Sequence, residues 1–295
     1  MVSVMSVQYL ILIPIISLAV AKVLLQGMIS RTYLKNPTDS ALYNAIVFGG
    51  MSVLYFVFTG FRLPSLHILP YGALYGAFLA GFQILYTIAL QRGPISLTTL
   101  IITFTILFSV SFGILYCGET LTILHVVGLV CVFLSLLMTI DFNQVKQHKF
   151  DIVWLLTSLG ATTMNGLSSI VLKLQKLSYP DEDTGMLLTA YISATLVLGL
   201  SILFFTKVKH MTKTVALHPS RVRIMLCSSL ILGAHLLLFS KGAGLIPAVV
   251  FFPVANIAPT TVLSLLGILV FKDKLTRQQL ISLCFGIAAT LLLCI

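Results

Sequence analysis

Ten apolar stretches, each about as long as a lipid bilayer is thick, follow one another from Tyr9 to Ile295. A helix that crosses the hydrocarbon core needs about 20 predominantly apolar residues, so each stretch predicts one spanning helix. The run Val126–Ile140 is apolar on every side, whereas the strands of membrane barrels alternate apolar and polar residues. We therefore predict an all-α, multi-pass integral membrane protein with helices at 7–29, 39–59, 68–90, 94–116, 121–141, 151–173, 185–206, 223–243, 246–271 and 276–295.

The composition leaves no room for a soluble domain. Hydrophobic residues make up 58% of the 295 and charged residues 9%, with a mean hydropathy of +1.08, whereas soluble domains are roughly half apolar and a quarter charged. The first segment lacks a basic n-region, so we expect it to remain in the mature protein. The five cysteines show no spacing typical of disulfides or metal sites, and we predict neither a metal nor a cofactor.

Polar residues in the two halves of the chain correspond in the same order, which indicates a duplication. The matched pairs, at shifts of 143 to 154 residues, are Lys22 with Asn165, Gln26 with Ser169, Gln83 with His235, and Glu119 with Asp273. Each half contains five predicted helices, an odd number, so the two copies enter the membrane with opposite orientation. The pattern predicts two inverted repeats, residues 1–143 and 144–295.

Two short motifs carry a resemblance to a known family. One is Gly118-Glu119-Thr120-Leu121-Thr122, followed by Gly128, and the other is the linker Ala89-Leu90-Gln91-Arg92-Gly93-Pro94. With ten helices, the chain resembles the ten-helix branch of the drug/metabolite transporter superfamily, the EamA-type transporters, over essentially its whole length. The second half departs from the pattern at Lys272-Asp273-Lys274-Leu275-Thr276, which lacks the glycine and shortens the acid. The resemblance implies a transporter and does not specify its substrate.

Lysine and arginine are distributed unequally between the two sides. Of the 18 basic residues, thirteen lie on loops after odd-numbered segments, four lie on the other side, and Lys22 lies inside a helix. Because basic loops stay in the cytoplasm, the charges predict that both termini face away from it, whereas the resemblance implies termini inside. The net charge of +10 is then explained by retention of the basic loops in the cytoplasm and by their contact with the anionic head groups of the lipid bilayer. It is not explained by binding of nucleic acid.

Polar residues at bilayer depth are candidates for function because charge is expensive there. Lys22 lies inside the first segment; it either lines a cavity or bonds to backbone carbonyls in a shifted helix. The sixth segment carries one polar face, which points either to a substrate through Asn165 or to interhelical hydrogen bonding. That face comprises Ser158, Thr162, Asn165, Ser169 and Lys173.

Three further segments supply candidates for the same cavity. His235 and Lys241 lie in segment 223–243, and Gln83 lies at the position related to His235. An aromatic stripe in segment 68–90 either packs or walls a binding site; its members are Tyr71, Tyr75, Phe78, Phe82 and Tyr86. In segment 246–271, Asn256 lies among three prolines, Pro247, Pro253 and Pro259. An internal proline frees a backbone carbonyl and tends to kink its helix. Transporters place such broken helices at the substrate site.

All eight acids lie at helix ends or in loops, and none lies near mid-membrane. The leading hypothesis is therefore a secondary transporter that moves a small anionic or zwitterionic metabolite by alternating access, with the substrate bound at a central cavity. Its predicted substrate-binding residues are Lys22, Gln83, Asn165, His235, Asn256, Tyr75 and Tyr86. The alternative is a transporter of a quaternary ammonium or other organic cation, such as choline, held by the tyrosines and Trp154 through cation–π contacts.

The chain is not predicted to be an enzyme. His235 and Ser240 are five residues apart and would not share a helix face, and no acid lies near to orient the histidine. The predicted location is the plasma (inner) membrane. The run Gly72, Gly76 and Ala80 has the small-xxx-small spacing of close helix contacts and would equally suit a homodimer interface.

Overall fold

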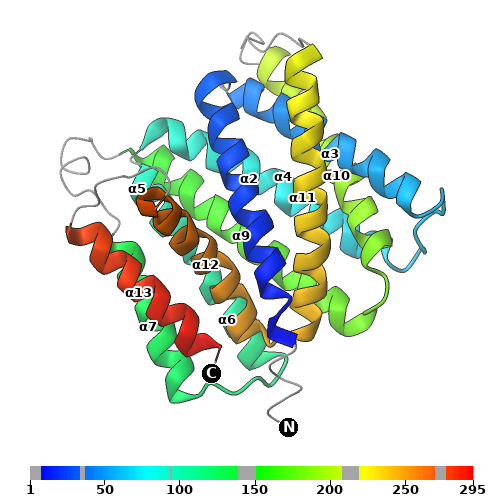
Figure 1. The fold of residues 1–295 in the computed structure, drawn as a ribbon. Coiled ribbons are helices and arrows are strands. Elements are labelled where there is room, and N and C mark those ends of the chain that lie inside the picture. Colours follow the sequence, from blue (N-terminus) through cyan, green and yellow to red (C-terminus); the bar gives the residue numbers. More distant parts are fainter. Residues whose placement is uncertain are drawn as a thin grey trace.

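The computed structural model describes residues 8–33, 37–93, 95–138, 151–207, 219–269 and 277–294, and within those residues the regular structure is helical throughout (Figure 1). The helices are α2 (Leu12–Tyr33), α3 (Pro37–Phe58), α4 (Leu69–Arg92), α5 (Ile95–Thr103), α6 (Thr105–Leu115), α7 (Ile123–Met138), α9 (Ile152–Ser178), α10 (Asp183–Lys207), α11 (Pro219–Leu245), α12 (Ala248–Leu269) and α13 (Arg277–Leu293). Among the described residues, five helices are long and apolar enough to span a bilayer, namely α3, α4, α9, α10 and α11.

Each of the ten predicted segments contains a helix, but two predicted details are wrong. In the fourth segment α5 and α6 meet at Phe104, which keeps helical φ and ψ. The sixth segment does not end at Lys173 but continues to Ser178, so Lys173 and Lys176, which the charge count placed on the side away from the cytoplasm, lie inside α9 and are buried. Pro247 lies just before α12, where its carbonyl accepts hydrogen bonds from the N–H groups of Val250 and Phe251.

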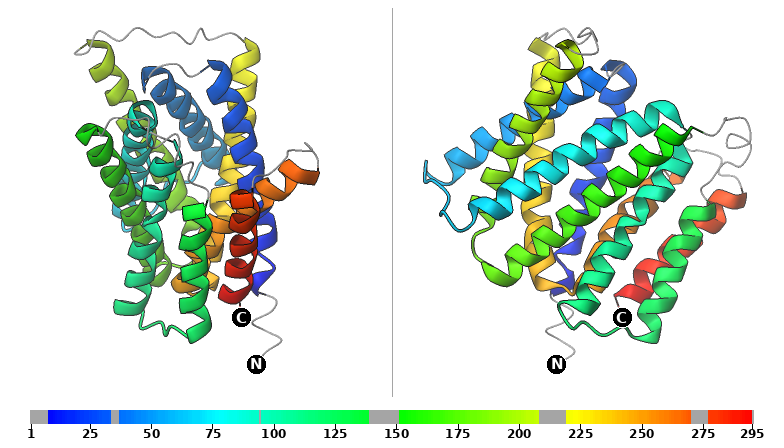
Figure 2. Two further views of the ribbon diagram at one scale, coloured as in Figure 1. Left: turned by 90° about the vertical axis from the view of Figure 1, so that its left-hand side faces the viewer. Right: turned by 180° about the vertical axis from the view of Figure 1, so that it is seen from behind.

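The helices pack mainly against partners from the other half of the chain. α4 lies between α9 and α10, α3 packs on α10, α2 packs on α11, and α7 pairs with α13 at one edge of the molecule (Figures 1 and 2). Gly76 permits the contact of α4 with α10, because a Cβ there would lie 2.1 Å from the carbonyl oxygen of Ala190. The small-residue run thus marks a close contact within the chain.

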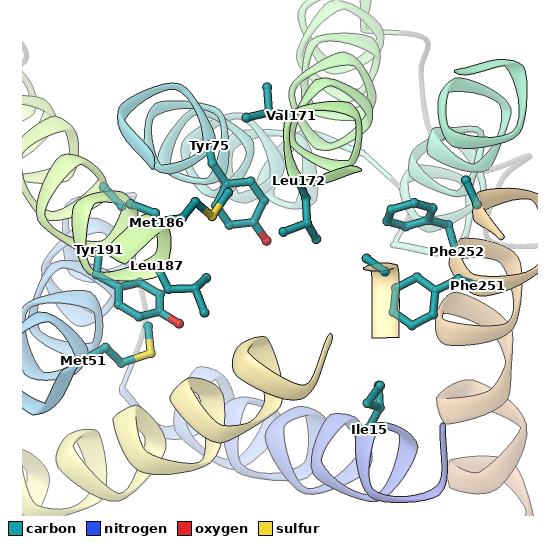
Figure 3. Packing of buried hydrophobic residues seen from close by; sticks show 14 of the residues in the cluster. Ile15, Met51, Tyr75, Val171, Leu172, Met186, Leu187, Tyr191, Phe251 and Phe252 are labelled. Atoms are coloured by element: carbon teal, nitrogen blue, oxygen red, sulfur yellow. The ribbon is translucent and has the colours of Figure 1, made fainter. Parts of the chain in front are cut away.

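Large apolar side chains fill the interior of the protein and also occupy much of its outer surface. Inside, Tyr191, Phe251 and Met51 are fully buried (Figure 3). Outside, α10 exposes a row of leucines that includes Leu196 and Leu200. Continuous apolar surface of this kind is unfavourable in water and is suited to contact with lipid.

Candidate functional site

A cavity of about 400 Å³ lies between the two halves of the chain, lined by residues of α2, α3, α4, α5, α9, α11 and α12. The lining includes all seven residues that the sequence analysis singled out, which are Lys22, Tyr75, Gln83, Tyr86, Asn165, His235 and Asn256. The volume is at the small end of the roughly 300–1,000 Å³ of ligand pockets. Contact of these side chains with a substrate stays a prediction.

The basic wall of the cavity is formed by Lys22 of α2 and His235 of α11, which lie close enough to interact electrostatically. Lys22 forms no hydrogen bond or ion pair with any residue that the structure describes. His235 is 5% exposed, and its Nδ1 has no hydrogen-bond partner within the same set of residues. A buried polar atom without a partner is unfavourable, so a ligand that satisfied both groups would bind with a gain in free energy.

Other lining residues are neutral and carry hydrogen-bonding groups. The Asn165 side chain lines the cavity and donates to Thr105 Oγ1 over 3.2 Å. Asn256 donates to the carbonyl of Phe252 over 2.7 Å, inside the stretch of α12 that contains Pro253 and Pro259. Gln83 lines the cavity from α4. These amides offer acceptors and donors without adding charge.

Aromatic rings cover the part of the cavity that α4 contributes. Tyr75 is buried and its hydroxyl points toward Leu172 (Figure 3). The rings of Phe82 and Tyr86 are stacked, with centroids 5.4 Å apart and planes 9° apart. Tyr71, at the end of the same stripe, instead bonds to Ser178 Oγ outside the cavity lining.

Trp154 and Lys241 are not among the residues that line the cavity. Trp154 packs against Gly93 and donates from its indole nitrogen to Thr98 Oγ1 over 2.8 Å, so it lies outside the lining that contains the tyrosines of the cation hypothesis. Lys241 is exposed near the end of α11 and is absent from the lining.

Sequence reasoning missed a set of buried charges where α9 and the α6–α7 loop meet the end of α11 and the start of α12. Lys173 Nζ lies 3.6 Å from Glu119 Oε1, and their side chains are only 7% and 14% exposed. Lys176 forms an ion pair with Asp183, which also accepts a 2.6 Å hydrogen bond from Ser240. The polar face of the sixth segment indicated Lys173, but its partner is 54 positions away and carries no local signal.

A local tightening of a helix adjoins the cavity. Phe104, between α5 and α6, keeps helical φ and ψ of −60° and −8°, and its N–H donates to the Ile101 carbonyl three residues earlier. The same carbonyl accepts a 3.0 Å hydrogen bond from Thr162 of α9. The Thr105 hydroxyl, at the start of α6, in turn donates to the Thr162 carbonyl, so this point of the chain is joined to α9.

Part of the chain matches a known protein family. Residues 5–140 match the profile of the EamA-like transporter family. The first half of the chain is thus similar to EamA-like transporters. Together with the apolar helices, the match points to an integral membrane protein, in agreement with the resemblance seen in its motifs.

The second half of the chain lies outside the family match but shares the fold of a solved structure. That crystal structure of a protein of 15% sequence identity superposes with a TM-score of 0.73 over 97% of this chain and 96% of its own. At this identity the similarity concerns the fold alone. A search of curated protein sequences gave no match.

Proposed function

We propose that this protein is a transporter of the EamA-like type and carries a small anionic or zwitterionic metabolite, bound in the cavity between its halves. The observation that carries the proposal is Lys22, a lysine that lines the cavity and has no partner among the described residues. The lining contains no aspartate or glutamate to neutralise it. A carboxylate or phosphate would pair with Lys22 through charge-assisted hydrogen bonds and would bring an acceptor within reach of His235.

Alternating access between two inverted repeats is the transport mechanism we infer. Its support is a set of helix contacts that occur in related pairs. We pair the helices of the two halves in order: α2 with α9, α3 with α10, α4 with α11, α5 and α6 together with α12, and α7 with α13. Under this pairing the contact of α4 with α9 is equivalent to the contact of α11 with α2. The contact of α4 with α10 is likewise equivalent to the contact of α11 with α3. The contacts of α3 with α10 and of α7 with α13 match themselves, as expected for helix pairs on a two-fold axis.

The location we propose is the plasma (inner) membrane, with the basic loops in the cytoplasm. The mean hydropathy and the apolar outer surface favour insertion. The distribution of lysine and arginine sets the orientation.

Substitution of Lys22 tests the anion site directly. In proteoliposomes Lys22→Met should abolish uptake of the substrate, because it removes the charge and keeps a side chain of similar bulk. Lys22→Arg should restore only part of it, since the guanidinium is larger and cannot give up its proton. Lys241→Met, which removes an exposed lysine outside the cavity lining, is the matched control and should transport normally. Full transport by folded Lys22→Met would refute the anion site.

A thermal-shift screen of the purified protein identifies the ligand class before transport is measured. Amino acids, organic acids, sugar phosphates and quaternary amines form the panel. Anything that binds the native state alone raises its unfolding temperature, by an amount that grows with the logarithm of the ligand concentration above Kd. We expect anionic or zwitterionic compounds to stabilise the parent, and to lose that effect in Lys22→Met.

The second candidate is transport of a quaternary ammonium, which the aromatic part of the lining favours. Tyr75, Phe82 and Tyr86 line the same cavity, and aromatic faces attract alkylammonium ions. This candidate makes the opposite prediction: Tyr75→Ala or Tyr86→Ala should weaken transport, and Lys22→Met should leave it intact or strengthen it. Lys22 argues against it, because its charge would repel the ligand.

A further inference from the structure

A pair of opposite charges joins the two halves at the end of the protein where the termini lie. The Glu119 carboxylate, in the α6–α7 loop, accepts hydrogen bonds from the N–H groups of Ala248 (2.8 Å) and Val249 (2.9 Å) at the start of α12. Lys173 of α9 donates to the carbonyls of Ala243 (3.0 Å) and Ile246 (3.1 Å) at the end of α11. Each charge therefore lies at the helix terminus that its sign stabilises. We call this arrangement, with its 3.6 Å ion pair, the latch.

The latch closes the cavity toward the termini. On α9 the cavity lining reaches Leu172, the residue next to Lys173, which forms the ion pair. Ile15, Phe251 and Phe252, which are at most 1% exposed, belong to the same apolar cluster as Leu172 (Figure 3). Passage toward the termini therefore requires that these apolar side chains separate and that the latch release α12.

Glu119 is attached firmly to the end of α6. Its N–H donates to the Gly113 carbonyl over 3.0 Å, in a turn where Gly118 has a φ of +67°. Gly113 lacks the side chain that would disturb this turn, since a Cβ there would lie 2.6 Å from Glu119 Oε2. A displacement of α6 must therefore carry the Glu119 carboxylate with it.

The other end of α6 is tied to the cavity. Thr105, its first residue, accepts a hydrogen bond from Asn165, which lines the cavity, and donates to the Thr162 carbonyl. Phe104, immediately before it, keeps helical φ and ψ and donates to the Ile101 carbonyl three residues earlier, so the helix is tightened where α5 meets α6. At 1.5 Å per residue, α6 spans about 16 Å between these two attachments.

We propose that α6 is a lever that couples occupancy of the cavity at Asn165 to release of the Glu119–Lys173 latch. A ligand that engages the Asn165 amide changes its bond to Thr105 and shifts the start of α6. Because Glu119 follows α6, the shift withdraws the carboxylate from α12 and opens the cavity toward the termini. The inference rests on alternating access as proposed above, and it does not depend on the charge class of the ligand.

The latch is tested by the accessibility of a thiol in the cavity. All five native cysteines are replaced by alanine, and Ala255→Cys adds a thiol in the lining, one turn from Phe251. A membrane-impermeant maleimide is applied from the side on which a C-terminal tag is accessible. Glu119→Gln should raise the labelling rate about tenfold or more, the change that loss of a charge-assisted hydrogen bond produces. Glu119→Asp, which keeps the charge, should give a smaller increase.

Two further variants control for damage to the fold. Gly113→Ala keeps both charges but places a methyl against the carboxylate, and it should also raise the labelling rate. Asp151→Asn removes an acid from the start of α9, where it caps the helix through Val153 and pairs with Arg92, and it should leave labelling unchanged. A folded Glu119→Gln variant that is labelled at the parent rate, together with an unchanged rate in Gly113→Ala, overturns the latch.

The lever is tested by a double-mutant comparison without any ligand. Thr105→Val removes the hydroxyl that joins Asn165 to α6, and we expect it to change the labelling rate in the parent but not when combined with Glu119→Gln. Thr163→Val, which removes a hydroxyl bonded only within α9, should have no effect in either background. Independent, additive effects of Thr105→Val and Glu119→Gln would overturn the lever and leave the latch standing. Since no substrate is used, failure of the anion hypothesis would not alter these results.

Discussion

Gly76→Ala is the substitution whose effect the packing defines most closely. The added methyl would lie 2.1 Å from the carbonyl oxygen of Ala190 and 2.8 Å from its carbonyl carbon. Ordinary contacts of this kind begin at 3.4 Å, so α4 and α10 must separate by about 1.3 Å, the difference of these two distances. The neighbour is backbone and cannot rotate away.

The free energy change combines two opposing effects. Overpacking of this kind destabilises by about 1–3 kcal/mol, and a backbone neighbour places this site at the upper end. Alanine in place of glycine in a helix stabilises the folded state by about 1 kcal/mol through its higher helix propensity. We therefore expect a net loss of about 2 kcal/mol for Gly76→Ala. Gly199→Ala on α10 is the matched control, because a Cβ there meets nothing within 4 Å, and it should be neutral or stabilising.

The assay is unfolding by SDS in mixed micelles, followed by the helical circular dichroism of the purified protein. Gly76→Ala should unfold at a lower SDS fraction than the parent, and Gly199→Ala at the same fraction or a higher one. Equal midpoints for the two variants would contradict the close approach of α4 to α10. Because α4 carries Tyr75, Gln83 and Tyr86, the same substitution should also alter ligand binding.

Three further outcomes are expected. A reporter fused after Ile295 should read as extracytoplasmic and one inserted in loop 207–223 as cytoplasmic; the reverse pair of signals would reject the orientation drawn from the basic residues. Lys173→Met should destabilise the protein by about 3 kcal/mol in the SDS assay, because it leaves a buried carboxylate without its cation; a loss below about 1 kcal/mol would argue against the pair. Ser135→Ala should cost about 1 kcal/mol, since Ser135 and Ser282 exchange hydrogen bonds of 2.7 Å between α7 and α13, and a double-mutant cycle with Ser282→Ala measures the coupling.

The sequence predicted the helices and the polar cavity lining because both depend on the cost of polar groups in hydrocarbon. Lys22 and Asn165 were conspicuous since a bilayer tolerates such residues only where they face protein or water. The same argument selected Asn256 between two internal prolines. Their presence in one cavity follows from the fold, and their contact with substrate stays a prediction.

What the sequence did not predict depends on partners far along the chain. The tightened turn at Phe104 occurs without a proline or glycine at that position, and its Ile101 carbonyl accepts both from the Phe104 N–H and from Thr162, 61 positions away. The sixth segment was ended at Lys173, with Lys176 outside it, because charges near the end of an apolar run usually mark its boundary. Their carboxylate partners lie on other elements, and pairing allows α9 to continue past them.

The preference of helices for partners in the opposite half has a consequence for biogenesis. α3 and α4 follow one another in the chain, yet their most extensive packing is on α10 and α9, and α7 pairs chiefly with α13. When the ribosome has completed α7, most of these surfaces still lack their partners. The first half is then inserted in the bilayer but not yet assembled, and we expect it to depend on lipid or on insertion factors until α13, the last helix, emerges. A truncated chain that ends before α9 should consequently be inserted and then degraded, and should not accumulate as a compact half-transporter.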